Sequence, residues 1–121
     1  MAQHANVLLP ETLRVLAFGS ITTSYVAVGA AYANPLRIFR LVNNTDGDMF
    51  FSIDAVHDNY FVPAGSFVLY DITGNSGMST NARIQSGTQF YVKYSGSPSK
   101  NSVYIEAIYG LGEDNPPQIP M

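Results

Sequence analysis

The feature that most constrains the fold is a series of short apolar runs between residues 36 and 71, cut at close intervals by turn residues. The first run, residues 36–42, is predicted to be a strand, in which alternate side chains point to opposite faces. One face carries Leu36, Ile38 and Val42, with Arg40 as a charged exception, and the other carries Arg37, Phe39 and Leu41. Because both faces hold apolar residues, we expect this strand to lie inside a sandwich or against a partner.

Turn residues follow at Asn43-Asn44-Thr45-Asp46-Gly47-Asp48. Such residues tolerate left-handed backbone geometry or bond to their own backbone, so the pattern predicts a chain reversal in a β-hairpin. The return strand is expected over 49–54, and a break at 55–59 precedes another strand near Tyr60. Pro63-Ala64-Gly65 then separates that strand from one in which Phe67, Leu69 and Asp71 oppose Val68, Tyr70 and Ile72.

The rest of the chain continues the same pattern. Further strands are expected over 12–18, from 21 to about 28 with a bend at Gly29, over 82–85, over 88–94 and over 102–109. A short helix within 21–33 is the alternative for that segment. Residues 72–81 are expected to form an exposed, mobile loop, and residues 95–101 a hairpin loop between antiparallel neighbours. About eight short strands without a convincing amphipathic helix predict an all-β fold, an antiparallel β-sandwich or jelly roll.

The domain organisation expected is one β-sandwich domain over 12–110, flanked by an N-terminal arm, 1–11, and a C-terminal arm, 111–121. An edge strand centred on Val7 is the alternative for the first segment. The last segment is rich in proline and glycine, so it is expected either to fray or to lay Ile119 and Met121 into a groove on a neighbouring molecule.

The composition favours contact with other chains. Of the 121 residues only 12% are charged, about half the usual share, and 46% are hydrophobic. We therefore expect other chains to cover part of the apolar surface; a neutral surface of Ser, Thr, Asn and Gly is the alternative. A net charge of −3 with six scattered basic residues predicts no nucleic-acid binding.

Other classes are disfavoured by what the sequence lacks. The first residues have no basic region and no long apolar run, so neither a signal peptide nor a membrane span is expected. There is no cysteine, which excludes disulfides, a thiol nucleophile and thiolate metal sites. Asn43-Asn44-Thr45 has the spelling of an N-glycosylation site and is interpreted as a turn.

Reactive residues form no recognised motif. His57 lies between Asp54 and Asp58, where an imidazole near two carboxylates can take a proton or a metal, but a structural or solvated role is expected. Asp46 and Asp48 share one turn that is a candidate for calcium, yet it lacks the EF-hand order of ligands and is interpreted as an Asx-rich turn. The sequence therefore predicts no catalytic, cofactor-binding or metal residues, no cofactor, and a protein that is not an enzyme.

Exposed aromatic residues are the last candidates. Tyr60, Tyr70, Tyr91 and Tyr104 are spaced along predicted strands, where such rings can form a platform for stacking sugars. Packing of these rings across neighbouring strands is the commoner arrangement. A carbohydrate-binding or receptor-binding module is therefore kept as an alternative function.

One family resemblance covers Ser20 to Tyr109, about three-quarters of the chain. It is carried by the segments RIFRLVNNTD (37–46), FSID (51–54), FVPAGS (61–66), YD (70–71), GTQFYV (87–92) and SVYIE (102–106). In their order these segments resemble small β-sandwich virion proteins of tailed bacteriophages. No functional residue carries over, because such proteins work through extended interfaces.

The resemblance implies a structural role in a virion. The chain would assemble in multiple copies, as a homo-oligomer, with copies of itself and other virion proteins as partners. A capsid cement or decoration protein is the position expected first, and a head-tail connector or tail component is the alternative.

Overall fold

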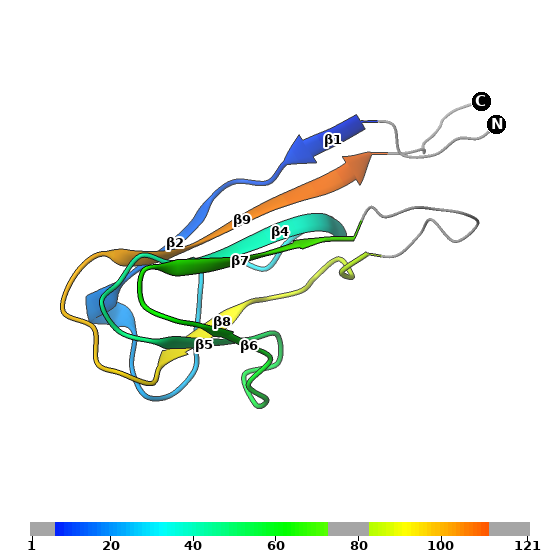
Figure 1. The fold of residues 1–121 in the computed structure, drawn as a ribbon. Helices are drawn as coiled ribbons and strands as arrows, with labels where there is room; N and C mark the ends of the chain where they lie inside the picture. Colours follow the sequence, from blue (N-terminus) through cyan, green and yellow to red (C-terminus); the bar gives the residue numbers. More distant parts are fainter. Residues whose placement is uncertain (1–6, 73–82, 112–121) are drawn as a thin grey trace, which may run out of the picture.

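The computed structural model describes residues 7–72 and 83–111, which form an antiparallel β-sandwich of two sheets. In Figure 1 the five-stranded sheet is the upper layer and the four-stranded sheet the lower one. The upper sheet contains β1 (Val7–Pro10), β2 (Arg14–Ala17), β4 (Leu36–Asn43), β7 (Ser66–Asp71) and β9 (Ser102–Leu111). The lower sheet contains β3 (Val26–Ala27), β5 (Met49–Ser52), β6 (Tyr60–Val62) and β8 (Tyr91–Tyr94).

The strand order is that of a jelly roll. The upper sheet runs β1-β9-β4-β7, with β2 pairing farther along the same edge of β9, and the lower sheet runs β3-β8-β5-β6. Among the described strands from β2 to β9, consecutive strands lie in different sheets, except that β5 and β6 are neighbours in one. The prediction of an all-β sandwich or jelly roll is therefore confirmed.

Two predicted hairpins are wrong. The turn at 43–48 joins β4 of the upper sheet to β5 of the lower sheet, and the loop at 95–101 joins β8 of the lower sheet to β9 of the upper sheet. Both connections pass from one sheet to the other instead of pairing the strands that they join. Turn residues reveal where a chain changes direction, but the partner of each strand depends on which apolar faces pack together.

The hydrophobic core lies between the sheets and follows the predicted alternation of β4 and β9. Phe39 and Leu41 of β4 and Val103 and Ile105 of β9 are at most 2% exposed. Leu36 was placed by the simple alternation on the opposite face from Phe39, and that placement is wrong. A register shift between Leu36 and Ile38 turns Leu36 inward, where it is fully buried.

Aromatic rings continue the core along its length. Phe39 stacks on Tyr70 with ring centroids 5.2 Å apart and contacts Phe90 at 5.3 Å. Phe90 in turn meets the edge of the Tyr32 ring at 6.0 Å. These rings fix the separation of the sheets, because each is packed by residues of both layers or of their connections.

Several local predictions are refined. Residues 7–10 form the edge strand β1, and between 21 and 33 the strand is limited to Val26–Ala27, followed by the predicted bend at Gly29 (φ 68°). No helix forms there. Of the strand predicted over 82–85, the described residues 83–85 contain one isolated bridge, between Ile84 and Leu36. The predicted loop at 72–81, apart from Ile72, and the predicted C-terminal arm at 111–121, apart from Leu111, lie outside the described residues.

Candidate functional site

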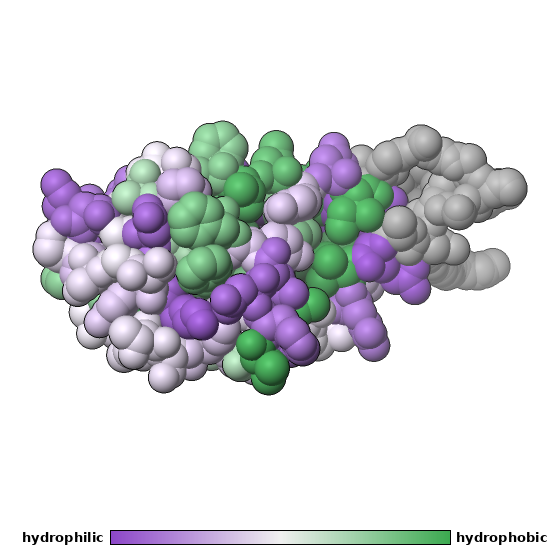
Figure 2. Space-filling model, turned by 60° about the horizontal axis from the view of Figure 1, so that its bottom comes forward, coloured by the Kyte–Doolittle hydropathy of each residue, from purple (hydrophilic) through white to green (hydrophobic). Residues whose placement is uncertain are grey.

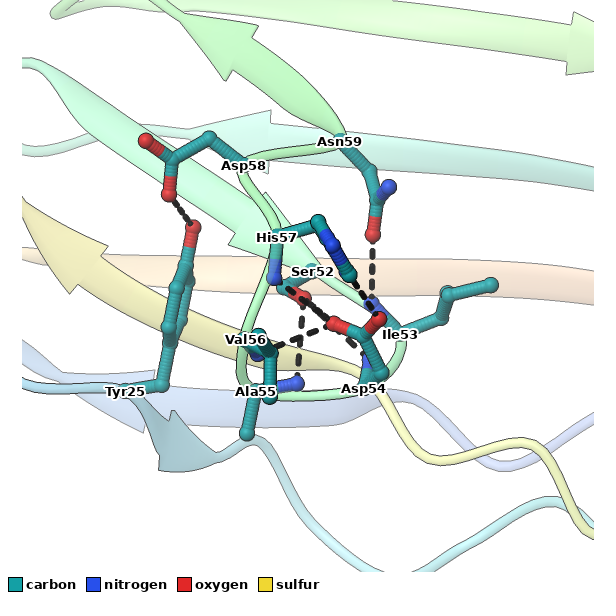
Figure 3. A network of polar contacts seen from close by, with 9 residues as sticks. All are labelled: Tyr25, Ser52, Ile53, Asp54, Ala55, Val56, His57, Asp58 and Asn59. Carbon is teal, nitrogen blue, oxygen red and sulfur yellow. Dashed lines mark hydrogen bonds and ion pairs between the residues drawn. The ribbon is translucent and has the colours of Figure 1, made fainter.

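The loop between β5 and β6 contains the histidine and the carboxylates that the sequence analysis considered. Its hydrogen bonds converge on Asp54, as Figure 3 shows. Oδ1 of Asp54 accepts the backbone N–H groups of Val56 and His57, each at 2.9 Å, and the hydroxyl of Ser52 at 2.8 Å. Oδ2 lies 2.7 Å from Nδ1 of His57. The loop therefore wraps around one carboxylate.

The protonation of this pair follows from those contacts. Hydrogen bonds from the His57 ring and backbone lower the pKa of Asp54 well below its usual range. The same contact with Asp54 raises the pKa of His57. Each group thus holds the other in its charged form at mildly acidic pH.

A serine, a histidine and an aspartate meet here, but they do not form a catalytic triad. In a triad the imidazole bridges the serine and the aspartate. In this loop the Ser52 hydroxyl donates to the same carboxylate as His57. Ser52 is also fully buried, so a substrate has no access to its hydroxyl. The arrangement stabilises a loop conformation, including Ala55 at φ 64°.

Asp58 does not join this network, because its side chain points away from His57 (Figure 3). It accepts a short hydrogen bond from the Tyr25 hydroxyl and lies 3.2 Å from Nζ of Lys93. Nζ of Lys93 also lies 4.7 Å from the centre of the Tyr25 ring. Burial and the bond to Asp58 raise the pKa of Tyr25, which keeps the phenol protonated.

The candidate calcium turn sends its two carboxylates in different directions. Asp46 accepts the backbone N–H of Ser99 at 2.7 Å and a short bond from the Ser99 hydroxyl. Asp48 accepts the backbone N–H of Ala64 at 2.9 Å. Among residues 7–72 and 83–111, no three His, Asp or Glu residues are grouped as a metal site requires. The turn uses its carboxylates to attach two neighbouring loops.

Asn43, the first residue of this turn, is fully buried. Its amide Nδ2 donates to the carbonyls of Gly47 and Val62, and its Oδ1 accepts the backbone N–H and the hydroxyl of Thr45. All of its polar capacity is used inside the protein. In the folded chain the side-chain amide of Asn43 is therefore not accessible for glycosylation at this sequence motif.

The four tyrosines proposed as a sugar platform lie on different surfaces. Tyr60 and Tyr70 pack together with ring centroids 5.2 Å apart, beside Phe39. Tyr91 is paired with Ser52 and Ala27 in the lower sheet, and Tyr104 with Val15 and Val42 in the upper sheet. Tyr60 and Tyr70 thus pack between the two sheets, while Tyr91 and Tyr104 have cross-strand neighbours within one sheet each.

A further surface feature is the outer side of the upper sheet, which we call the outer apolar face. Cross-strand neighbours form three rows across it: Val15, Tyr104, Val42 and Phe67; Glu106, Arg40 and Leu69; Pro10, Ile108, Ile38 and Asp71. Val15, Phe67 and Leu69 are 47%, 54% and 56% exposed, and Leu8 beside the third row is 45% exposed. Apart from the central Arg40–Glu106 pair and Asp71 at the edge, the rows are apolar.

The opposite side of the molecule is more mixed. Figure 2 views the molecule from the side of the lower sheet and shows apolar areas separated by polar side chains. Phe61 on this side is 48% exposed, and Val56 in the β5–β6 loop is 72% exposed. No helix among the described residues has the length and apolarity needed to cross a membrane.

Sequence reasoning did not identify the outer apolar face, although one signal for it was present. The row of Leu36, Ile38 and Val42, with Arg40 as a charged exception, belongs to a predicted strand whose other row is also apolar. Only the pairing with β7 and β9 shows that this row, apart from Leu36, faces outward and is continued by Leu69 and Ile108.

The comparisons with known proteins give no relative for this chain. No protein-family model, curated protein or solved structure matches it.

Proposed function

We propose that this protein is a structural component of a bacteriophage virion that assembles in multiple copies, as a capsid cement or decoration protein. The observation that carries the proposal is the outer apolar face, where Phe67 and Leu69 are more than half exposed on a single strand. Monomeric proteins rarely expose large apolar patches, so the face is suited to contact with other chains.

The reactive residues support a role without catalysis. Ser52, Asp54 and His57 stabilise a loop, and Asp46 and Asp48 attach neighbouring loops. Jelly rolls occur in viral capsid proteins and also in lectins and cupins, so the fold is compatible with the proposal but does not select it.

The experiment is mass spectrometry of density-purified particles of a phage that encodes this chain. We expect the protein in the particles at a copy number proportional to that of the major head protein. A few copies per particle would instead indicate the alternative position, a head-tail connector or tail component. Absence from the particles, with the protein abundant in the lysate, would contradict a virion role.

A carbohydrate-binding or receptor-binding module is the second candidate, and one observation favours it. On the outer side of the lower sheet, Phe50 and Phe61 lie 5.2 Å apart, and Nζ of Lys93 lies between the Phe50 and Tyr25 rings at 5.8 and 4.7 Å. Such a row of rings beside polar groups suits sugar stacking. The Asp58 carboxylate next to it is already occupied by Tyr25 and Lys93, which weakens this candidate.

Titration with a panel of oligosaccharides, followed by NMR, tests the second candidate. Binding would shift the ring resonances of Phe50 and Phe61, and Phe61→Ala would abolish the shifts of Phe50. Tyr104→Ala, on the opposite sheet, is the matched control and should leave them unchanged.

A further inference from the structure

We propose that two copies of this chain pack their outer apolar faces together about a two-fold axis that passes between Arg40 and Glu106. The inference rests on the proposed assembly in multiple copies and specifies which face is used, which partner covers it and which symmetry relates the two. The partner is a second copy of the same chain.

The first argument is the charge pattern at the centre of the face. Arg40 and Glu106 are directly opposite each other on β4 and β9, and Nε and Nη2 of Arg40 both contact Oε1 of Glu106 at 2.6 Å. In a two-fold interface, when one residue of the first copy contacts a second residue of the other copy, the same contact also forms with the two copies exchanged. Arg40 of one copy then faces Glu106 of the other, and the reverse, so the centre is complementary to itself.

The second argument is that this ion pair has unused bonding capacity. Neither Nη1 of Arg40 nor Oε2 of Glu106 makes a hydrogen bond or an ion pair with the other described residues. The guanidinium also lies 5.0 Å from the centre of the Phe67 ring, within the range of a cation–π interaction. The side chains of Arg40 and Glu106 are 37% and 48% exposed, so both are accessible to a second molecule.

The third argument is area. Four strands about 4.8 Å apart, with residues rising about 3.4 Å each along the eight residues of β4, give a flat sheet surface of roughly 500 Å² per copy. The pair then buries about 1,000 Å², which is the lower limit for a specific interface. Side chains that protrude from the sheet add to this buried area, so the outer apolar face by itself is large enough for a dimer interface.

The remaining charges argue for a copy over other partners. The rows of the face hold one cation, Arg40, and two carboxylates, Glu106 and Asp71. A surface so close to neutral does not repel its own copy, and it offers no cluster of basic groups to an anionic polymer or an acidic membrane. In Figure 1 the β5–β6 loop projects from the lower sheet, which makes that side a poorer surface for flat packing.

Charge reversal in two complementary variants tests the arrangement. Arg40→Glu places four carboxylates at the centre of a homodimer, and Glu106→Arg places four guanidinium groups there. We expect each variant alone to weaken the dimer by on the order of 100-fold, because like charges across an interface cost several kcal/mol. An equimolar mixture of the two variants should restore a dimer, and native mass spectrometry should show that it contains one chain of each kind.

The matched control is Lys100→Glu, which makes the same change of charge at an exposed residue in the β8–β9 loop. It should leave the dimer unchanged. Circular dichroism checks that all variants remain folded, as expected for substitutions of exposed side chains. Recovery in the mixture separates a contact between copies from damage to the monomer, because a misfolded chain is not rescued by a second misfolded chain.

The possible failures have different meanings. If the wild-type protein assembles and neither charge reversal weakens it, another surface mediates assembly, so this inference fails while the proposed function stands. Weakening without recovery in the mixture refutes the two-fold axis between Arg40 and Glu106. If the wild-type protein is monomeric at high concentration, self-assembly fails as well. A dimer that forms only when residues 112–121 are deleted would show that the chain covers its own face.

Discussion

A Cβ atom placed on Gly47 would lie 2.1 Å from the carbonyl oxygen of Gly96. These two glycines belong to the two connections that cross between the sheets, β4 to β5 and β8 to β9. Their contact, together with the hydrogen bonds that Ser99 donates to Asp46, attaches the connections to each other at one end of the sandwich.

Gly47→Ala is expected to lower the free energy of unfolding by about 3 kcal/mol, because backbone atoms of two connections must move apart. Urea denaturation followed by circular dichroism measures the change. Gly19→Ala is the control, since a Cβ there meets nothing within 4 Å. Equal effects of the two substitutions would contradict the close packing at Gly47.

Asn43→Ala is expected to destabilise the fold by about 3 kcal/mol, because it leaves buried backbone groups of Thr45 and Val62 without their side-chain partner. The neighbouring Asn44 is exposed, so Asn44→Ala should change stability by no more than about 0.5 kcal/mol. The difference in urea midpoint between the two variants measures the buried network. A small effect at Asn43 would show that water or another side chain replaces its bonds.

The pair Asp54 and His57 predicts a pH dependence of the β5–β6 loop. The pKa of His57 is raised in the folded state, so its stabilising contribution is complete below about pH 6.5 and is lost as the pH rises through the folded pKa. The pKa of Asp54 is lowered, so its contribution is present above about pH 3.9 and is lost as the pH falls through its folded value. The contribution of this pair to the stability of the β5–β6 loop should therefore be greatest between about pH 4 and 6.5.

NMR titration of the His57 ring checks this prediction. The His57 pKa should lie above the ordinary histidine value in the wild-type protein and return toward it in Asp54→Asn, which retains an acceptor oxygen but removes the charge. His57→Gln assigns the resonance. An unchanged His57 pKa in Asp54→Asn would show that the two side chains do not interact in solution.

Arg14→Lys is expected to destabilise the fold by about 1 to 2 kcal/mol. The Arg14 guanidinium bonds to the carbonyls of Ala30 at 3.0 Å and Thr12 at 2.6 Å and lies 4.1 Å from the centre of the Tyr32 ring. A lysine keeps the charge but cannot reproduce this fork of donors. Thermal unfolding of Arg14→Lys and Arg14→Met separates the roles: equal losses would assign the effect to the donors, and a stable Arg14→Lys would assign it to the charge.

The sheet faces were largely predictable because alternation depends only on local geometry. Phe39 and Leu41 share one row of the strand predicted over 36–42, and the structure places that row in the core. Which of the two apolar rows faces inward was not predictable from the strand alone. Leu36 was not predictable, since the register shift beside it arises from pairing with β9. The loop around Asp54 was recognisable as a break in the pattern, but its hydrogen bonds required the fold.

The sequence by itself determined an all-strand sandwich, the positions of most strands and turns, and the absence of any recognised catalytic motif, because these depend on residue type and spacing along the chain. Only the tertiary structure decided that residues 43–48 and 95–101 cross between sheets, and that Ile38, Val42, Phe67 and Leu69 share one outward surface. The physical reason is that strands become neighbours when their pairing buries whole apolar faces. Such burial depends on segments that are distant in the sequence, so no single turn or run of residues determines it.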